Sequence, residues 1–253
     1  MALLAAHGEI TPMPDCAIFA DTGWEPKAVY KHLRWLMSPN VLPFPVRIVR
    51  NGNIRESLTT SKPGRYEAVP FYLKTNNGYS MGRRQCTHEY KLKPLRWAYR
   101  ELLGKGRKER IKGGAVTAWI GISFDEVMRM KESGIAWCVN RWPLVEKRFD
   151  RQDCLRWLEG HRYPLPPKSS CIGCPFHNDN YWRAMRDHTP EEFADAVSVD
   201  HQIRNGGTQF TIMRAEQFIH PSCVPPDQVD LSTAADHGQL NLFNNECQGM
   251  CGV

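Results

Sequence analysis

Residues 15–50 read DCAIFADTGWEPKAVYKHLRWLMSPNVLPFPVRIVR, and this stretch decides the fold. The apolar run at 15–20 has the length and the flanks of a buried strand. A polar turn, DTGW, follows it, and Pro26 suits the first turn of a helix that extends to about Met37. Residues 45–50 alternate in polarity and read as a second strand. A strand, a helix and another strand in succession predict a parallel sheet in an α/β domain.

The flanking sequence extends this pattern with further elements. Helices are predicted at 1–8, 85–103, 123–133, 150–160, 178–187 and 190–204, and strands at 115–121 and 135–140. Pro94 is expected to kink or divide the second of these helices. Ser123 suits the N-cap of the third, with Glu126 at the capping-box position. Residues 51–81 are polar and predict a long functional loop, and the last 40 residues are expected to be irregular.

Length and composition limit the class of protein. With 253 residues, 42% hydrophobic and 24% charged, the chain has the composition of a soluble globular protein. We expect an α/β domain over 1–145, carrying a smaller helical and cysteine-bearing lobe over 146–253. The chain has no apolar run near 18 residues, which argues against a transmembrane helix and a membrane partner. The opening MALLAA is too short for a secretory signal, so a cytoplasmic location is predicted.

Positive charge is concentrated in the middle of the chain. The formal net charge is +6, yet residues 83–112 hold eleven Lys and Arg against three Glu, a net charge of +8. We call this segment the basic block. No Lys or Arg follows Arg214, so the end of the chain is acidic. The basic block suits a polyanion, either the phosphates of a nucleotide or the backbone of DNA or tRNA. The alternative interpretation is a solvated helix face.

Nine cysteines are many for a chain without an export signal. In a reducing compartment, cysteines more often serve as metal ligands or redox groups than as disulfides. Cys16 and Cys138 lie in apolar, strand-like runs and are predicted to be core thiols. Cys154 falls on an amphipathic helix and is expected to be buried too. Cys223 lies in a proline-rich loop, and its role is ambiguous.

The remaining five cysteines favour a shared site. Cys171 and Cys174 form a CxxC followed by proline, which can chelate one metal or cluster. Cys86 lies beside arginines at the expected start of a helix, where its thiolate is favoured. Cys247 and Cys251 lie in the glycine-containing tail, where they could supply a fourth ligand or a mobile nucleophile. The alternatives are a zinc site or a set of unconnected thiols.

Three polar motifs fall where an α/β sheet binds ligands, at strand ends and helix starts. They are Asp21-Thr22-Gly23, Arg83-Arg84 and Gly121-Ile122-Ser123. The first offers a carboxylate and backbone groups to a ribose or an adenine edge. The second can clamp phosphate or sulfate, and the glycine of the third lets the backbone approach a ligand. Each motif alone is a weak signal, and Asp21-Thr22-Gly23 is equally typical of an ordinary turn, but their joint occurrence at strand ends carries more weight.

Five segments together carry a family resemblance: FADTGWEP, RRQCTHEYKLKPLR, GISFDEVMRMK, PLPPKSSCIGCPFH and NECQGMCGV. Their combination resembles the phosphoadenosine phosphosulfate reductase-like branch of the PP-loop ATP pyrophosphatase superfamily, which is frequent in phages and prophages. The resemblance implies an adenine nucleotide α-hydrolase-like fold, a parallel sheet with helices on both faces. It implies ATP or a sulfonucleotide as ligand, sulfur transfer or reduction as chemistry, a [4Fe–4S] cluster, and a protein sulfur donor or reductant.

The chain departs from the family pattern in its phosphate-binding loop. The family has an SGGxDS-type loop after its first strand and before its first helix, and no SGG occurs here. Met1 instead falls within the expected first helix. We therefore expect either that the start was placed too late or that the product is truncated at its N-terminus and inactive.

The cysteine pattern departs from the family as well. The cluster-bearing reductases have tandem cysteines where this chain has Gln85 before Cys86. By resemblance, Cys86, Cys171 and Cys174 are cluster ligands. Two tail cysteines complete the expected set, Cys251 as fourth ligand and Cys247 as nucleophile.

Three functions therefore compete. The first is an enzyme of adenine-nucleotide-dependent sulfur chemistry, either sulfonucleotide reduction or sulfur transfer to a nucleic acid. The second is a nucleic-acid-associated binding protein with structural zinc, in which the basic block contacts phosphates. The third is an inactive truncated homologue. The sequence leaves the choice open.

Overall fold

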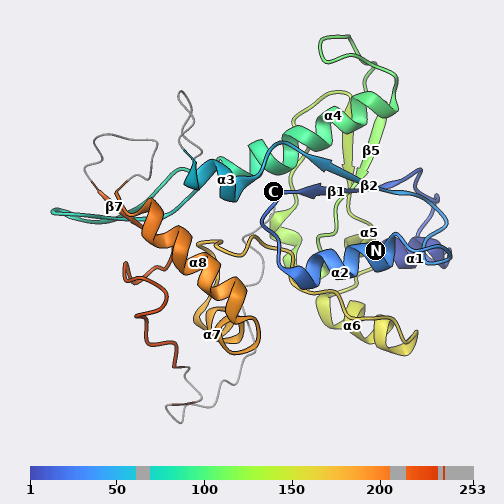
Figure 1. Cartoon of the computed structure of the whole chain (residues 1–253). Helices are drawn as coiled ribbons and strands as arrows, with labels where there is room; N and C mark the ends of the chain where they lie inside the picture. The colour runs from blue at the N-terminus through green and yellow to red at the C-terminus, as the bar shows by residue number, and fades with distance from the viewer. Residues whose placement is uncertain (61–68, 206–214, 233–235, 237–253) are drawn as a thin grey trace.

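The computed structural model describes residues 1–60, 69–205, 215–232 and 236 (Figure 1). Its elements, in chain order, are α1 (Ala2–Ala6), β1 (Ala17–Asp21), α2 (Lys27–Leu36), β2 (Val46–Arg50), α3 (Ile54–Thr59), β3 (Tyr72–Thr75), β4 (Gly78–Met81), the π-helical segment η1 (Thr87–Leu92), α4 (Lys93–Leu102), β5 (Val116–Trp119), the 3₁₀ segment η2 (Phe124–Arg129), β6 (Cys138–Arg141), α5 (Pro143–Glu146), α6 (Arg151–Gly160), α7 (Asp179–His188), α8 (Pro190–Ile203) and β7 (Glu216–Phe218).

The strands form short sheets of two kinds. β1 pairs with β2 in parallel, from Ala17 opposite Val46 to Asp21 opposite Arg50, which confirms the pairing expected from residues 15–50. β5 and β6 form a second parallel pair. A third sheet is antiparallel, with the order β4-β3-β7. The chain is thus a mixed α/β protein. In Figure 1, α4 lies above the β1–β2 pair and α2 below it.

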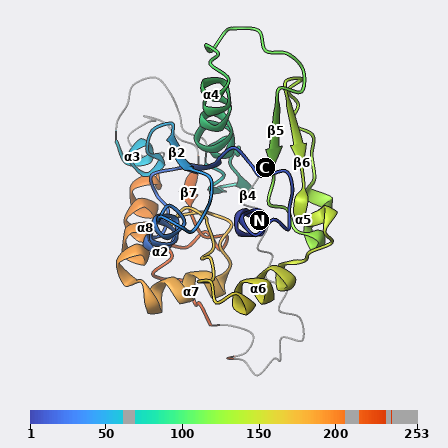
Figure 2. The same ribbon diagram turned by 90° about the vertical axis from the view of Figure 1, so that its right-hand side faces the viewer.

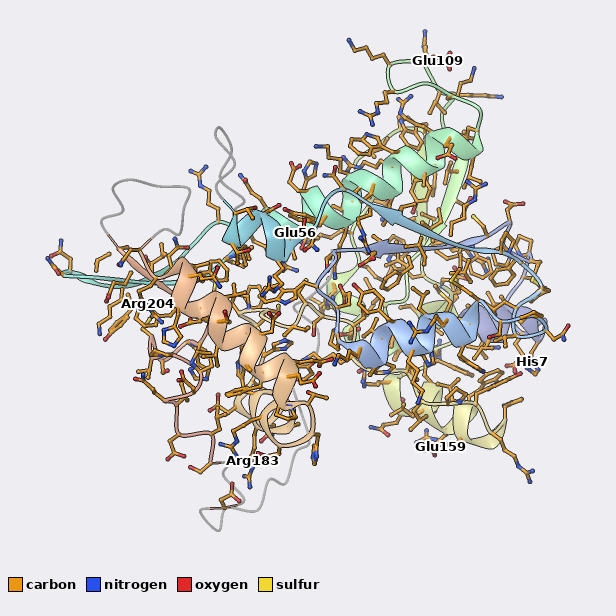
Figure 3. The ribbon with its side chains drawn as sticks, in the orientation of Figure 1. His7, Glu56, Glu109, Glu159, Arg183 and Arg204 are labelled. Carbon is orange, nitrogen blue, oxygen red and sulfur yellow. The ribbon has the colours of Figure 1, made fainter. Side chains whose placement is uncertain are left out.

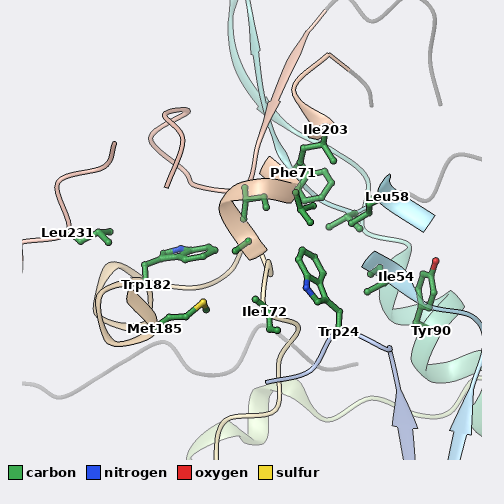
Figure 4. Close-up of a cluster of buried hydrophobic side chains, with 14 residues drawn as sticks. Trp24, Ile54, Leu58, Phe71, Tyr90, Ile172, Trp182, Met185, Ile203 and Leu231 are labelled. Atoms are coloured by element: carbon green, nitrogen blue, oxygen red, sulfur yellow. The ribbon is translucent and has the colours of Figure 1, made fainter. Parts of the chain in front are cut away.

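Two hydrophobic clusters hold the described residues together. The larger, shown in Figure 4, centres on Trp24 and Trp182 and includes residues from Ile54 to Leu231. The smaller packs Leu4 and its neighbours against residues as distant as Trp157. Each cluster combines side chains from before and after residue 145, so the C-terminal part packs on the N-terminal part at both places.

Several helix predictions are confirmed at their boundaries. α6, α7 and α8 occupy the predicted ranges. α6 begins with a reciprocal capping box between Asp150 and Asp153, and α7 begins at the Asn178 cap. The helix predicted at 85–103 is divided near Pro94, which sits in the first turn of α4 after the π-helical segment η1.

The prediction of a long loop over 51–81 is wrong for the residues that the structure describes there. Asn53 caps α3 by accepting a hydrogen bond from the Glu56 backbone N–H at 3.2 Å, and a hairpin formed by β3 and β4 follows after the segment 61–68, which lies outside the described residues. β3 also pairs with β7, which belongs to the last 40 residues expected to be irregular. The polar composition of residues 69–81 gave no sign of the hairpin. The strand that completes its sheet, β7, lies far along the chain and could not be recognised from the local sequence.

The helix predicted over 123–133 is also wrong. Only a 3₁₀ segment over Phe124–Arg129 forms, and Glu126 inside it has a non-helical backbone. The Ser123 side chain makes no capping hydrogen bond. The Glu126 carboxylate pairs forward with Arg129 and so does not reach back to close a capping box.

In the part of the chain that the structure describes, no helix has the length and apolar character needed to cross a membrane.

Candidate functional site

Asp21, the last residue of β1, has its carboxylate buried within the protein. Asp21 is buried and accepts hydrogen bonds from the Gly23 N–H at 2.7 Å, the Tyr30 hydroxyl at 2.9 Å and the Arg50 guanidinium. Burial acts to raise the pKa of Asp21, but the hydrogen bonds from Arg50, Gly23 and Tyr30 outweigh it and hold the pKa below its usual value. Asp21 thus ties β1 to β2.

Thr22 lines a pocket beside the turn that follows β1, and Glu25 lies behind it as its hydrogen-bond partner. Thr22 is buried, and its hydroxyl donates to Glu25 Oε1 at 3.0 Å while accepting from the Cys171 thiol at 3.3 Å. Ser169 donates to the other Glu25 oxygen at 3.3 Å. Burial raises the pKa of Glu25 despite the opposing charge of Lys91. Glu25 was not predicted as a site residue; a carboxylate between two apolar groups, in GWEP, was the only local signal.

Gly23 and Trp24 fix the shape of the turn. Gly23 has φ of +78°, and a Cβ there would lie 2.8 Å from Asn53 Cγ, so only glycine fits. The Trp24 indole N–H donates to Asp195 Oδ2 at 2.6 Å. Asp195 also accepts from Arg55 Nε at 2.7 Å, so one carboxylate joins the turn, α3 and α8.

The CxxC loop is held directly against this turn. The Ile172 N–H donates to the Trp24 carbonyl at 2.8 Å, and Figure 4 shows the two side chains next to each other. Gly173 packs on the indole, where a Cβ would lie only 2.2 Å from Trp24 Cη2. The Cys174 N–H donates to the Cys171 carbonyl at 3.0 Å and closes the loop. The motif therefore has one defined conformation.

His177 supports the loop from behind. Its Nε2 lies 2.9 Å from the Cys171 carbonyl oxygen, and its ring stacks on Tyr181 with centroids 3.9 Å apart. Burial lowers the pKa of His177 to about 3, so the ring is neutral at physiological pH. A neutral ring that faces a carbonyl oxygen must carry its proton on Nε2, which donates this hydrogen bond.

These segments line one pocket that opens to solvent. Its polar and sulfur-bearing wall consists of Thr22, Arg84, Cys86, Thr87, Lys91, Ser170, Cys171 and Cys174, and its apolar wall includes Trp24, Ile54, Val69, Pro70, Pro175 and Phe176. The cavity volume is about 40 Å³, enough for a few water molecules.

Three of the five cysteines expected to share a site thus meet at this pocket. Burial, reinforced by the nearby Glu25 carboxylate, raises the pKa of Cys171 to about 12. Burial also raises the pKa of Cys86, and it outweighs the opposing effect of Arg84. The expectation that Cys86 is a favoured thiolate is therefore wrong, since desolvation exceeds the stabilisation by the neighbouring cation. Cys174 lines the same wall.

The two predicted arginines are placed differently. Arg84 lines the pocket, donates from Nε to the Thr87 hydroxyl at 3.2 Å, and lies 5.3 Å from the centre of the Phe176 ring. Arg83 is exposed and is not part of the pocket wall. Lys91, which was not predicted as a site residue, belongs to η1 and joins Arg84 as a second cation in the wall.

The other predicted site residues do not reach the pocket. Gly121 and Ser123 follow β5, which hydrogen-bonds with β6 rather than with β1, and neither lines the pocket. Cys247 and Cys251, the predicted nucleophile and fourth ligand, lie outside the described residues.

The pocket thiols are the right ligand type for an iron–sulfur cluster or zinc, but their positions do not form a ligand set. Thiolates are the preferred ligands of both groups. Among the described residues, however, no three Cys, His, Asp or Glu side chains come together as a metal-ligand set.

No protein-family model, curated protein or solved structure matches the chain.

Proposed function

We propose that this pocket performs adenine-nucleotide-dependent sulfur chemistry, either reduction of a sulfonucleotide or transfer of sulfur to an acceptor, in an adenine nucleotide α-hydrolase-like fold. One observation carries the proposal. Cys86, Cys171 and Cys174, from two distant segments, line one cavity together with Arg84 and Lys91 at the carboxyl end of β1. Nucleotides bind at this end of parallel strands in open α/β sheets.

The two cations give the pocket its ligand preference. Arg84 and Lys91 would bind the phosphate or sulfate end of ATP or a sulfonucleotide. The CxxC loop would then hold its thiols beside that terminal group. Proximity of this kind lowers the entropic cost of a thiol–ligand reaction. The free thiols of the described chain are consistent with a reducing compartment such as the cytoplasm.

Binding of the nucleotide is the first test. Titration calorimetry with ATP and with adenosine 5′-phosphosulfate is expected to show binding, and Arg84→Gln is expected to weaken it by roughly tenfold, because one charge-assisted hydrogen bond is removed. Lys31→Gln removes an exposed cation on α2 and serves as the control. If neither ATP nor adenosine 5′-phosphosulfate binds, the proposal is refuted.

The sulfur chemistry needs its own assay. Anaerobically purified protein is expected to convert the sulfonucleotide to sulfite and AMP while dithiothreitol is oxidised to its disulfide. Alternatively, with ATP and a sulfide donor, it is expected to replace an oxygen of a DNA or tRNA acceptor by sulfur, releasing pyrophosphate on adenylation and AMP on attack by sulfide. Cys247→Ser, which removes the nucleophile that the family resemblance implies, is expected to abolish either activity while leaving nucleotide binding within about threefold of the unmodified protein. Iron and zinc contents of the same preparation test the predicted [4Fe–4S] cluster and its zinc alternative. If the protein binds a nucleotide but neither reduces a sulfonucleotide nor transfers sulfur, the proposed sulfur chemistry is rejected and only the nucleotide-binding function is retained.

A further inference from the structure

The end of the basic block forms an exposed loop at the far end of α4. Residues 104–112 contain five basic residues and one glutamate, a net charge of +4. Every residue of the loop is exposed except Ile111, which is half-buried. Figures 1 and 2 show it projecting beyond the rest of the molecule, and Figure 3 labels Glu109 at its tip. We call residues 104–112 the basic loop.

The loop is anchored to α4 rather than simply trailing from it. Gly104, with φ of +64°, ends the helix, and its N–H donates to the Glu101 carbonyl at 2.9 Å. Arg100 Nη1 donates to two loop carbonyls, those of Gly106 at 2.7 Å and Glu109 at 2.9 Å. These bonds give the loop a fixed backbone path.

Stacking adds a further contact at the base of the loop. The Arg107 guanidinium lies 4.1 Å from the centre of the Trp97 ring, and Lys93 lies 5.2 Å from the same ring. Such cation–π contacts hold a charged group in place without neutralising it. The indole of Trp97 therefore positions positive charge on α4 and the loop.

The single acidic residue of the loop is used within it. Glu109 Oε2 accepts a hydrogen bond from the Gly106 N–H at 2.9 Å and lies 4.0 Å from Lys105 Nζ. Lys108, Arg110 and Lys112 have no ion pair among the described residues. The loop thus presents three exposed cations whose charge is not balanced locally.

We propose that the basic loop binds the phosphate backbone of a nucleic acid. Clustered exposed cations bind DNA and RNA through their phosphates and release counterions as they do so. The loop itself carries one apolar side chain, Ile111, whereas protein interfaces and membrane anchors both need apolar side chains at their centre. A polyanion recognised by charge is the partner that this surface fits.

This binding does not depend on the chemistry of the pocket. About 15 Å of helix, the length of the ten residues of α4, separates the loop from η1 and its pocket residues. A nucleic acid held on the loop could nevertheless extend along α4 toward Arg84 and Lys91. Binding to the loop and binding of a nucleotide in the pocket are therefore separately measurable.

The test compares two triple variants with equal loss of charge. In the first, Lys108, Arg110 and Lys112 are each changed to Gln. The control carries Lys31→Gln, Arg34→Gln and Arg151→Gln, three exposed cations on α2 and α6, away from the loop. Fluorescence anisotropy follows binding to a labelled DNA duplex of about 25 base pairs, an RNA hairpin and a single strand, at salt concentrations from about 50 to about 200 mM.

The loop variant is expected to bind at least tenfold more weakly at low salt. Its plot of log affinity against log salt concentration should be shallower than that of the unmodified protein by about 2 to 3, close to one unit for each phosphate that the variant no longer neutralises. The control variant should keep both the affinity and the slope. Unchanged melting temperature and ATP binding in the loop variant would show that the fold and the pocket are intact.

Three results would overturn the inference. Undetectable binding of all three nucleic acids by the unmodified protein is the first, and an equal loss in the control variant is the second, because it would indicate a response to net charge alone. The third is tighter, loop-dependent binding to phosphatidylserine vesicles than to nucleic acid, which would assign the loop to a membrane surface. None of these results bears on nucleotide binding in the pocket.

Discussion

Gly173 is the residue of the CxxC loop that packs on the Trp24 ring in the turn after β1. Its lack of a side chain allows the backbone to lie on the Trp24 indole, and the adjoining Ile172 amide then reaches the Trp24 carbonyl. In a CxxC motif, a glycine between the cysteines lets both thiolates bind one metal without straining the turn. The structure adds a packing reason that acts whether or not a metal is bound.

Gly173→Ala is therefore expected to destabilise the protein. The new methyl group would overlap the ring of Trp24, a buried and rigid neighbour, and overpacking of this kind costs about 2 kcal/mol. Thermal unfolding should show a melting temperature lower by roughly 5 °C. Gly160→Ala, at the end of α6 where a Cβ would meet nothing within 4 Å, is the matched control and should not be destabilising. Equal melting temperatures for the two variants would contradict the packing argument.

His177 makes the stability of the protein sensitive to acid. Its folded-state pKa, about 3, lies below the ordinary value of 6.5, so the unfolded chain binds the proton more readily. The corresponding stability is fully present above pH 6.5 and is lost progressively as the pH falls toward 3. Between pH 7.5 and 5.5, the loss from this one residue is about 1.4 kcal/mol.

Urea unfolding at these two pH values provides the measurement. His177→Gln keeps an N–H donor for the Cys171 carbonyl but does not titrate, so its free energy of unfolding should fall less than that of the unmodified protein by about this amount. The other histidines contribute equally to both proteins and cancel. An identical pH dependence in the two proteins would mean that His177 is not buried in its neutral form.

At the scale of elements, short-range signals account for the helices that were predicted well. The Asp153 N–H donates to the Asp150 carboxylate at 2.7 Å, and the Asp150 N–H donates to the Asp153 carboxylate at 3.0 Å. α6 begins at Arg151, directly after Asp150. The spacing Asn53 to Glu56 is the same kind of signal and could have revealed α3. Ser123 shows the limit of such patterns, because its side chain makes no capping hydrogen bond and Glu126 pairs with Arg129 instead.

Asp150→Ala is expected to lower the free energy of unfolding by about 1 kcal/mol, since the first turn of α6 would lose its side-chain acceptor. Asp150→Ser retains an oxygen that can accept the Asp153 N–H and should lose only a small part of that stability. Chemical denaturation of both variants checks the difference. If the alanine and serine variants have the same denaturation midpoint, the cap does not stabilise this helix.

At the scale of the whole molecule, the sequence predicted individual helices and strands better than the long-range contacts between them. The parallel pairing of residues 15–20 with 45–50 follows from local periodicity and is confirmed. The hairpin β3–β4 was missed because its third strand, β7, lies about 140 residues further along the chain. The burial of Glu25 was invisible for the same reason, since Ser169 and Cys171 cover it from a remote segment.

The candidate site was predicted in part. The common location of Cys86, Cys171 and Cys174 was expected, and the structure brings all three to one pocket. Spacing in the sequence could not reveal that desolvation would keep two of these thiols protonated, because burial depends on packing across the whole chain. Ligand and nucleophile roles for these cysteines stay predictions.

The contact between the turn after β1 and the CxxC loop also governs when the pocket comes into being. Thr22 and Cys171 are 149 positions apart, so joining them closes a very long segment of chain, at an entropic cost of about 4 kcal/mol. On the ribosome, β1, α2 and β2 emerge long before their partner loop is synthesised. The nascent protein therefore has the first wall of the pocket but no pocket until translation has passed the CxxC loop.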